Sequence, residues 1–215
     1  MSLPLAKIIQ ALHWRYAVKI FNSKKKLSTA DLNALLEAVR LSPSSLGLLP
    51  YKIVVVENTA ARKLIFEQAS NQRKITEASH LLVFCTYRSY TRSFIDAFVD
   101  MFSKQRHLSP EQTANLRKAR RAFVKETSPK DLDEWAGDQA FIGLGVLVAS
   151  AALAGIDAGP MGGFKPEVLD EILNLRRYNL RSRVLCTLGY RSAEDAEAKA
   201  KKVRWPFKDF VIKIK

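Results

Sequence analysis

Residues 140–156, AFIGLGVLVASAALAGI, form the stretch that decides how this chain folds. The stretch holds no charged residue, and its small and aliphatic side chains would occupy every side of a helix. A helix that is apolar all round is buried inside a protein. The run is shorter than the ~20 residues that span a bilayer and is rich in Gly and Ala, so it predicts a buried core helix without a membrane span. We expect this helix to cover about residues 131–154 and to end at Gly155.

Further helical patterns lie on both sides of this central helix. The segment Ser28-Thr29-Ala30-Asp31 has the spacing of a capping box and predicts a helix that starts at Ser28. Pro43 ends that helix, because the residue before a proline is pushed out of the helical region. The remaining helices are expected at residues 5–14, at 59–69, in two pieces between 90 and 125, and at 166–173.

Short apolar runs between the helices predict strands. They lie at residues 53–56, 80–86 and 183–188, and residues 210–214 have a strand-like pattern. Strands separated by helices indicate a layered α/β or α+β fold, and 215 residues fit a single domain over residues 1–215. The apolar central helix and the apolar tail present more surface than one small domain covers. We therefore expect a homodimer, with the helix near the interface and the tail reaching the partner.

The formal net charge of +14 is the abnormal bulk property. It favours anionic partners such as nucleic acid, phosphorylated cofactors or acidic surfaces. The cations are spread along the chain, with one denser run at residues 117–121, and no zinc-finger, RNP-like or basic-zipper pattern accompanies them. A basic nucleic-acid-binding or regulatory protein without enzymatic activity is therefore the alternative interpretation. The N-terminus lacks a signal-peptide pattern, and Cys85 and Cys186 lie in apolar runs, which favours buried thiols in a reducing cytoplasm.

Familiar catalytic constellations are absent from the sequence. The three histidines, His13, His80 and His107, lie at no ligand spacing to one another or to a cysteine, so no metal site is expected. There is no nucleophile elbow and no Walker loop, and the string from Gly159 to Gly163 is not a dinucleotide fingerprint. An enzyme that lacks its own acid, base or nucleophile set needs a cofactor to supply the chemistry.

Several segments suit one planar, anionic ligand. Arg15, Ala17 and Lys19 alternate along an extended stretch and can share a face. Asn71 and Lys74 are three residues apart, which is one face of a helix. Each signal taken alone also fits a solvated surface residue or a plain loop. The other segments supply hydroxyls in a turn, close backbone approach, and phosphate donors; they are Ser42 to Ser45, Gly159 to Gly163, and the pair Lys202 and Arg204.

In order and separation these segments resemble the FMN-dependent, oxygen-insensitive NAD(P)H nitroreductase family, including its dihydropteridine-reductase-like members. The likeness covers nearly the whole chain and is strongest at residues 15–21, 42–51, 71–85, 155–164 and 194–206. It implies an α+β nitroreductase-like fold: a mixed β-sheet flanked by helices, in a homodimer whose C-terminal arms are exchanged between subunits.

The resemblance also implies roles for particular residues. Arg15, Lys202 and Arg204 would hold the FMN phosphate, with backbone contacts from Tyr16 and Ala17. Two ammonium groups and one amide would meet the pyrimidine side of the flavin, where reduction adds negative charge. They belong to Lys19, Lys74 and Asn71. A turn from the other subunit would complete the site with Pro43, Ser44 and Ser45. A backbone segment would pass beside the ring, with an N–H near flavin N5; it consists of Pro160, Met161, Gly162 and Gly163.

The sequence departs from the family pattern in four places, which are Ala17 for a common Ser, Gly162 for a common Glu, the apolar run at residues 46–49, and Tyr51 for a common Trp. We expect ping-pong chemistry in which NAD(P)H reduces the flavin and a nitroaromatic, quinone or pterin is then reduced in the same place. Leu46 and Phe123 are the expected apolar contacts of the acceptor. The basic run at residues 117–121 could attract the dinucleotide. No side chain need act as proton donor, because the flavin and solvent can supply protons.

Overall fold

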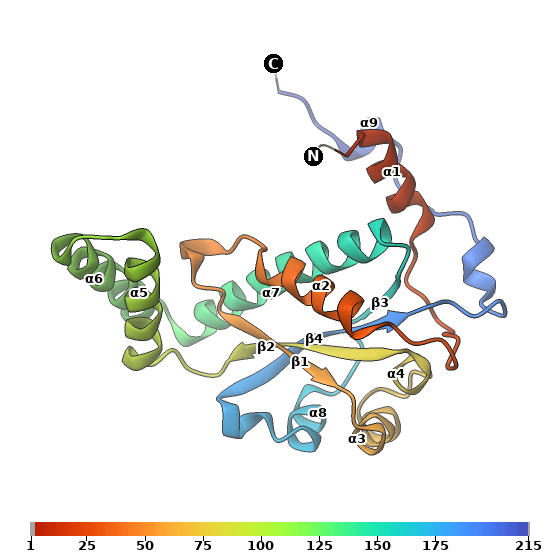
Figure 1. The fold of residues 1–215 in the computed structure, drawn as a ribbon, viewed down its shortest axis with the longest axis horizontal. Helices are drawn as coiled ribbons and strands as arrows, with labels where there is room; N and C mark the ends of the chain where they lie inside the picture. The colour runs from red at the N-terminus through yellow and green to blue at the C-terminus, as the bar shows by residue number, and fades with distance from the viewer. Residues whose placement is uncertain (1–2, 215) are drawn as a thin grey trace.

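A computed structural model describes residues 3–214. Its sheet has four strands in the order β1-β2-β4-β3. The strands are β1 (Tyr51–Val56), β2 (His80–Tyr87), β3 (Asp157–Met161) and β4 (Leu180–Gly189) (Figure 1). The three predicted strands are confirmed. The fourth, β3, was not predicted, since Gly159 and Pro160 are poor strand residues; it lies at the sheet edge, where a proline is tolerated.

The helices cover both faces of this sheet, which confirms the predicted α+β layering. α7 (Pro129–Leu153) and α2 (Thr29–Arg40) lie on one face, and α3 (Thr59–Leu64), α4 (Lys74–Glu77) and α8 (Pro166–Ile172) lie on the other (Figure 1). The expectation of a mixed sheet is wrong within residues 3–214, because all three strand pairings are antiparallel. The remaining strand-like segment, residues 210–214, forms no strand in the chain and so adds no parallel neighbour.

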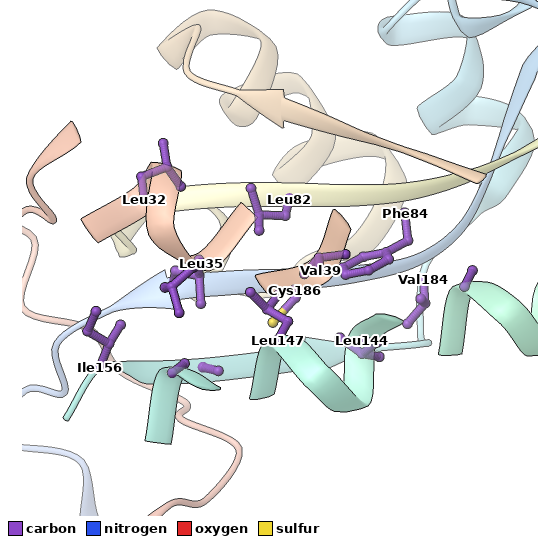
Figure 2. Close-up of a cluster of buried hydrophobic side chains, with 14 of the residues drawn as sticks. Leu32, Leu35, Val39, Leu82, Phe84, Leu144, Leu147, Ile156, Val184 and Cys186 are labelled. Carbon is purple, nitrogen blue, oxygen red and sulfur yellow. The ribbon is translucent and has the colours of Figure 1, made fainter. Parts of the chain in front are cut away.

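Each face of the central strand β2 has its own core. Successive side chains of a strand point to opposite faces. Leu82 and Phe84 therefore pack with α2 and α7, whereas Leu81, Val83 and Cys85 pack with the helices on the other face. Figure 2 shows Phe84 and Leu82 of β2 among side chains of α2, α7 and β4. A strand buried on both faces reads as the continuous apolar run seen in the sequence.

The helix ends follow from local sequence. Ser28 accepts a hydrogen bond from the Asp31 N–H at 3.0 Å, so it caps α2 as predicted, and α2 ends at Arg40, before Pro43. The predicted helix at 59–69 is instead α3 followed by a π-helical turn, η2 (Ile65–Ser70). The other helices are α1 (Leu5–Trp14), α5 (Arg92–Arg106), α6 (Pro110–Glu126) and α9 (Phe207–Phe210).

The central helix α7 is not buried on all sides within one chain. Phe141, Ile142 and Leu153 are 51%, 42% and 43% exposed. By length and composition α7 alone, among residues 3–214, could cross a membrane, and half of its most apolar window is buried inside the fold. Burial against α2 and the sheet is the environment of a core helix, and its exposed apolar flank is surface that the chain itself leaves uncovered.

The C-terminal arm, residues 200–214, and α1 extend from one corner of the fold (Figure 1). No residue of α1 is buried. Along the arm, large apolar side chains face solvent; they are Val203, Trp205, Phe207, Phe210, Ile212 and Ile214, each at least 72% exposed. A soluble monomer rarely exposes so much contiguous apolar surface, so this surface indicates that something covers the arm.

Candidate functional site

A buried lysine marks the centre of the candidate site. Lys74, the first residue of α4, is 3% exposed, and its ammonium has one hydrogen bond, to the Pro160 carbonyl at 3.4 Å. Its side chain crosses Gly159, where an added Cβ would lie 3.4 Å from Lys74 Cδ and 3.2 Å from the Val18 carbonyl oxygen. Burial and then the charge of Lys19 lower the pKa of Lys74 to about 8, and within residues 3–214 no carboxylate is among the groups that shift it. A buried cation with one long hydrogen bond suits an anionic group.

This burial predicts a pH-dependent stability. The unfolded chain keeps the Lys74 proton up to about pH 10.5, whereas the folded chain releases it from about pH 8. The unfolded state therefore binds more protons in this window, so the free energy of unfolding rises with pH. Relative to Lys74→Met, cofactor-free wild type should gain about 3 kcal/mol between pH 7.5 and 10.5. Urea unfolding at several pH values in this range measures the difference in free energy of unfolding between wild type and Lys74→Met.

Lys63→Met on the exposed face of α3 is the control for this measurement. A pH-independent difference between wild type and Lys74→Met would contradict the burial of a charged ammonium.

The three residues predicted to hold a phosphate lie together. Lys202 donates hydrogen bonds to the carbonyl oxygens of Leu12 at 2.7 Å and His13 at 3.2 Å, and a further one to the Arg15 carbonyl. Burial, followed by the nearby charges of Arg15 and Arg204, lowers the pKa of Lys202. The ammonium thus satisfies the free carbonyls at the end of α1 and brings the arm beside Arg15.

An aspartate that sequence reasoning missed holds the extended segment at residues 15–20. Asp195 Oδ2 accepts hydrogen bonds from the Tyr16 hydroxyl at 3.0 Å and from the backbone N–H of Lys19 and Ile20 at 2.9 and 3.1 Å. Burial opposes the ionisation of Asp195, but these hydrogen bonds outweigh it and hold its pKa below the ordinary value. Tyr16 is thereby fixed by its side chain, while Ala17 lies half-buried next to it.

Arg191 is a second residue that the sequence did not single out. It pairs with Asp157 at 2.5 Å and stacks over the rings of Trp14 at 4.1 Å and Tyr16 at 4.6 Å. The Arg191 N–H also donates to Asp157 at 2.7 Å. These partners lie far apart in the sequence, and no local spacing links them. Together Asp195 and Arg191 fix the backbone on which Arg15 and Lys19 sit.

Asn71 and Gly163 line one cavity of about 360 Å³. Asn71 has a left-handed φ of 43° and ends η2, whereas Lys74 begins α4. The prediction that the two share one helical face is therefore wrong, because a turn separates two helices there. Gln72 Nε2 donates to the Gly163 carbonyl at 3.0 Å and ties the two segments together.

The backbone segment predicted to lie beside the ring runs from the end of β3 to Gly163, which lines this cavity. Pro160 is half-buried, and the side chain of Met161 is buried in the core, so Met161 can offer only its backbone. Gly162 and Gly163 are exposed, and an added Cβ at Gly162 would meet no atom within 4 Å. The open backbone at these two glycines permits close approach of a flat group.

The turn at Pro43, Ser44 and Ser45 lies elsewhere. The Ser45 N–H donates to Gln139 Oε1 in the first half of α7 at 2.7 Å, whereas α1 packs near Ala152 at the other end of α7. Thirteen helical residues separate these contacts by about 20 Å. Within one chain this turn is therefore far from the α1 end of α7. Sequence reasoning placed the turn in the partner's site, and this separation is compatible with that.

Leu46 and Phe123 lie in the same region as that turn. Leu46 packs against a cluster that contains Leu48, Ile95 and Trp135, and the ring of Phe123 meets Trp135 edge-on at 5.1 Å. Leu46 has a left-handed φ of 59°, which is uncommon for a branched side chain and indicates a constrained turn. The two predicted acceptor contacts thus come together where the α5–α6 hairpin meets α7.

The basic run at residues 117–121 is less cationic than its sequence suggests. Arg117 pairs with Asp100 at 2.7 Å, and Arg121 pairs with Asp96 at 2.5 Å. Both acids come from α5 and could not be placed beside α6 from the sequence. The run is therefore not a free basic stripe, and the nucleic-acid alternative gains no support from it.

Comparisons with known proteins identify the family. The sequence model of the nitroreductase family matches residues 12–190. An oxygen-insensitive NAD(P)H nitroreductase of Salmonella typhimurium is 29% identical, over 96% of this chain and 99% of the relative. The major NAD(P)H-flavin oxidoreductase of Aliivibrio fischeri is 32% identical, over 95% of this chain and 97% of the relative.

Solved structures share the fold. A Bacillus subtilis protein assigned to the nitroreductases superposes with a TM-score of 0.88 at 22% identity, over 98% of this chain and 100% of the other. A protein of Exiguobacterium sibiricum with the same assignment, solved in complex with FMN, has a TM-score of 0.80 at 17% identity, over 100% and 99% of the two chains. With the family match over most of its length, the chain belongs to the nitroreductase family.

Proposed function

We propose that this protein is an FMN-dependent oxidoreductase that uses NAD(P)H to reduce nitroaromatic, quinone or pterin-like acceptors. The observation that carries the proposal is the buried ammonium of Lys74 beside Lys19; among the described residues, 3–214, no carboxylate pairs with Lys74. An anionic planar cofactor supplies the missing negative charge. The names of the relatives, one of them a flavin oxidoreductase, and the FMN bound to a structural neighbour support the same reading.

The residues present fit FMN in two groups. Arg15, Lys202 and Arg204 hold the phosphate, since three cations converge there. Lys19, Lys74 and Asn71 face the pyrimidine edge, with the exposed backbone of Gly162 and Gly163 beside the ring. When bound, FMN accepts a hydride from NAD(P)H and passes reducing equivalents to the acceptor. The chain itself orients these partners and holds positive charge where reduction adds negative charge.

We further propose that the site is completed in a homodimer with a cytoplasmic location. The apolar arm and the exposed flank of α7 supply the surface, and Pro43, Ser44 and Ser45 then serve the partner's flavin. Both cysteines are free and buried, which fits a reducing compartment. The acceptor lies against Leu46 and Phe123, at the base of the α5–α6 hairpin.

The direct test of the function is spectroscopic and kinetic. Purified protein incubated with FMN should take up the flavin and show its visible absorption, and should oxidise NADH or NADPH when an acceptor is present. A panel of both nucleotides against nitroaromatics, quinones and dihydropteridine ranks the substrates. A protein that stays colourless after incubation with FMN would sink the proposal.

Removing residues 207–215 tests the dimer. The deletion leaves Lys202 and Arg204 in place but removes Phe207, Phe210 and Ile212, whose burial contributes roughly 1.5–3 kcal/mol each. The dissociation constant of the dimer should rise about 100-fold or more by the same scale, and FMN affinity should fall with it. Sedimentation with and without FMN measures both. The double variant Lys208→Met and Lys213→Met keeps the apolar tail and should remain dimeric; a flavin-loaded wild-type monomer would contradict the shared site.

A further inference from the structure

Arg62 of α3 is a buried charge that meets no carboxylate among its hydrogen-bond partners. It is 5% exposed, and its guanidinium donates only to backbone carbonyls. Nε binds the Ile75 oxygen at 2.6 Å, Nη2 binds that of Ala78 at 2.7 Å, and Nη1 binds that of Ser79 at 3.1 Å. Burial lowers the pKa of Arg62. Burying a charge costs free energy unless hydrogen bonds compensate for it, and here three backbone carbonyls provide those hydrogen bonds.

Those carbonyls belong to the end of α4 and the turn that follows it. α4 has only four residues, Lys74–Glu77, so it cannot satisfy its own terminal carbonyls. A planar guanidinium with a fixed fork of donors can hold three oxygens at once, and a cation is favoured at a helix C-terminus. Ile75 and Ala78, on either side of this end, are fully buried. Arg62 therefore ties the C-terminal end of the short helix to α3.

The other end of α4 is Lys74. With its C-terminal end pinned by Arg62, α4 presents the Lys74 side chain across Gly159 to the Pro160 carbonyl. A four-residue helix has little stability of its own, so its place depends on such tertiary contacts. We propose that Arg62 is a positioning residue for Lys74: it holds α4 so that the Lys74 ammonium meets the reducible end of the flavin.

This inference rests on the proposed function, and the action it assigns to Arg62 is geometric. The charge of Arg62 acts on Lys26 and His80, whose pKa values fall through burial and nearby charges that include it. The contacts that link Arg62 to Lys74 run through the backbone of α4 and the turn after it, which Arg62 binds at the Ile75 and Ala78 carbonyls. Loss of Arg62 should therefore change flavin reduction through the position of Lys74.

The experiment measures how much more tightly the protein binds reduced FMN than oxidised FMN, from potentiometric titration of the loaded dimer. Lys74→Met should lower this preference about tenfold, which is about 30 mV for a two-electron couple. Arg62→Met should lower it about threefold or more in the same direction, and in the Lys74→Met background it should add no further change. Arg62→Lys keeps the charge without the fork, so it should behave like Arg62→Met and not like wild type.

Lys63→Met, the next residue along α3 with an exposed side chain, is the matched control and should keep the wild-type preference. If Arg62→Met does not fold, Arg62→Lys provides the same test of the preference for reduced FMN. The inference is overturned if Arg62 variants keep the wild-type preference, if Arg62→Lys restores it, or if the shift is equally large without Lys74. Failure of wild type to bind FMN would instead refute the proposed function, which separates the two failures.

Discussion

Arg15→Met combined with Arg204→Met should weaken FMN binding by about 100-fold to 10,000-fold, because each lost charge-assisted hydrogen bond to phosphate removes about 1.5–3 kcal/mol. Lys202 lies near both of these cations, but its ammonium also caps α1 through the Leu12 and His13 carbonyls. A Lys202 variant would therefore mix cofactor binding with the stability of α1. The Arg15 and Arg204 pair separates the two effects.

Riboflavin provides the internal control, since it has the same ring and no phosphate. The double variant should bind riboflavin within about threefold of wild type, because the lost hydrogen bonds go to phosphate alone. Isothermal titration of FMN and riboflavin gives both constants. The double variant Lys199→Met and Lys201→Met removes two exposed charges from the same segment and should keep FMN binding nearly unchanged. Equal loss of FMN and riboflavin would place the phosphate elsewhere.

Phe84→Ala should lower the free energy of unfolding by about 3–5 kcal/mol. The Phe84 side chain of β2 is fully buried in the core formed with α2 and α7 (Figure 2). Its ring centroid lies 6.3 Å from that of Tyr51. Removing the ring leaves a cavity lined by α2, α7 and β4 that these packed elements cannot close. Urea unfolding of cofactor-free protein measures the loss.

Leu41→Ala is the matched control for this variant. Leu41 follows α2 and is 68% exposed, so its truncation should change the free energy of unfolding by less than about 0.5 kcal/mol. A loss at Phe84 no larger than that at Leu41 would mean that β2 is not the centre of the core. Both variants retain every residue of the candidate site.

The sequence predicted the parts of this protein that depend on local pattern. The cap at Ser28 and the continuous apolar run of β2 each stem from neighbouring residues, and both are confirmed. β3 was missed because Gly159 and Pro160 read as a loop, and only the edge position makes a strand of them. The π-helical turn η2 was missed because its helical periodicity is nearly that of an α-helix.

The sequence predicted the charged residues of the candidate site but not the residues that hold them in position. Lys74 and Arg15 could be singled out by their order along the chain. Asp195 and Arg191 could not, since Asp195 binds Tyr16 across 179 residues and no pattern in one sequence joins them. Arg62 was hidden for another reason: an arginine in a helix reads as a surface residue, and only its burial on three carbonyls reveals otherwise.

The cap on α1 has a consequence for biosynthesis. α1 leaves the ribosome well before the lysine that satisfies its last carbonyls, because that lysine lies 190 residues later than Leu12. At typical elongation rates this interval lasts about 10–40 s. Throughout that time the last carbonyls of α1 lack this donor, so the docking of α1 against the C-terminal arm is a late step of folding.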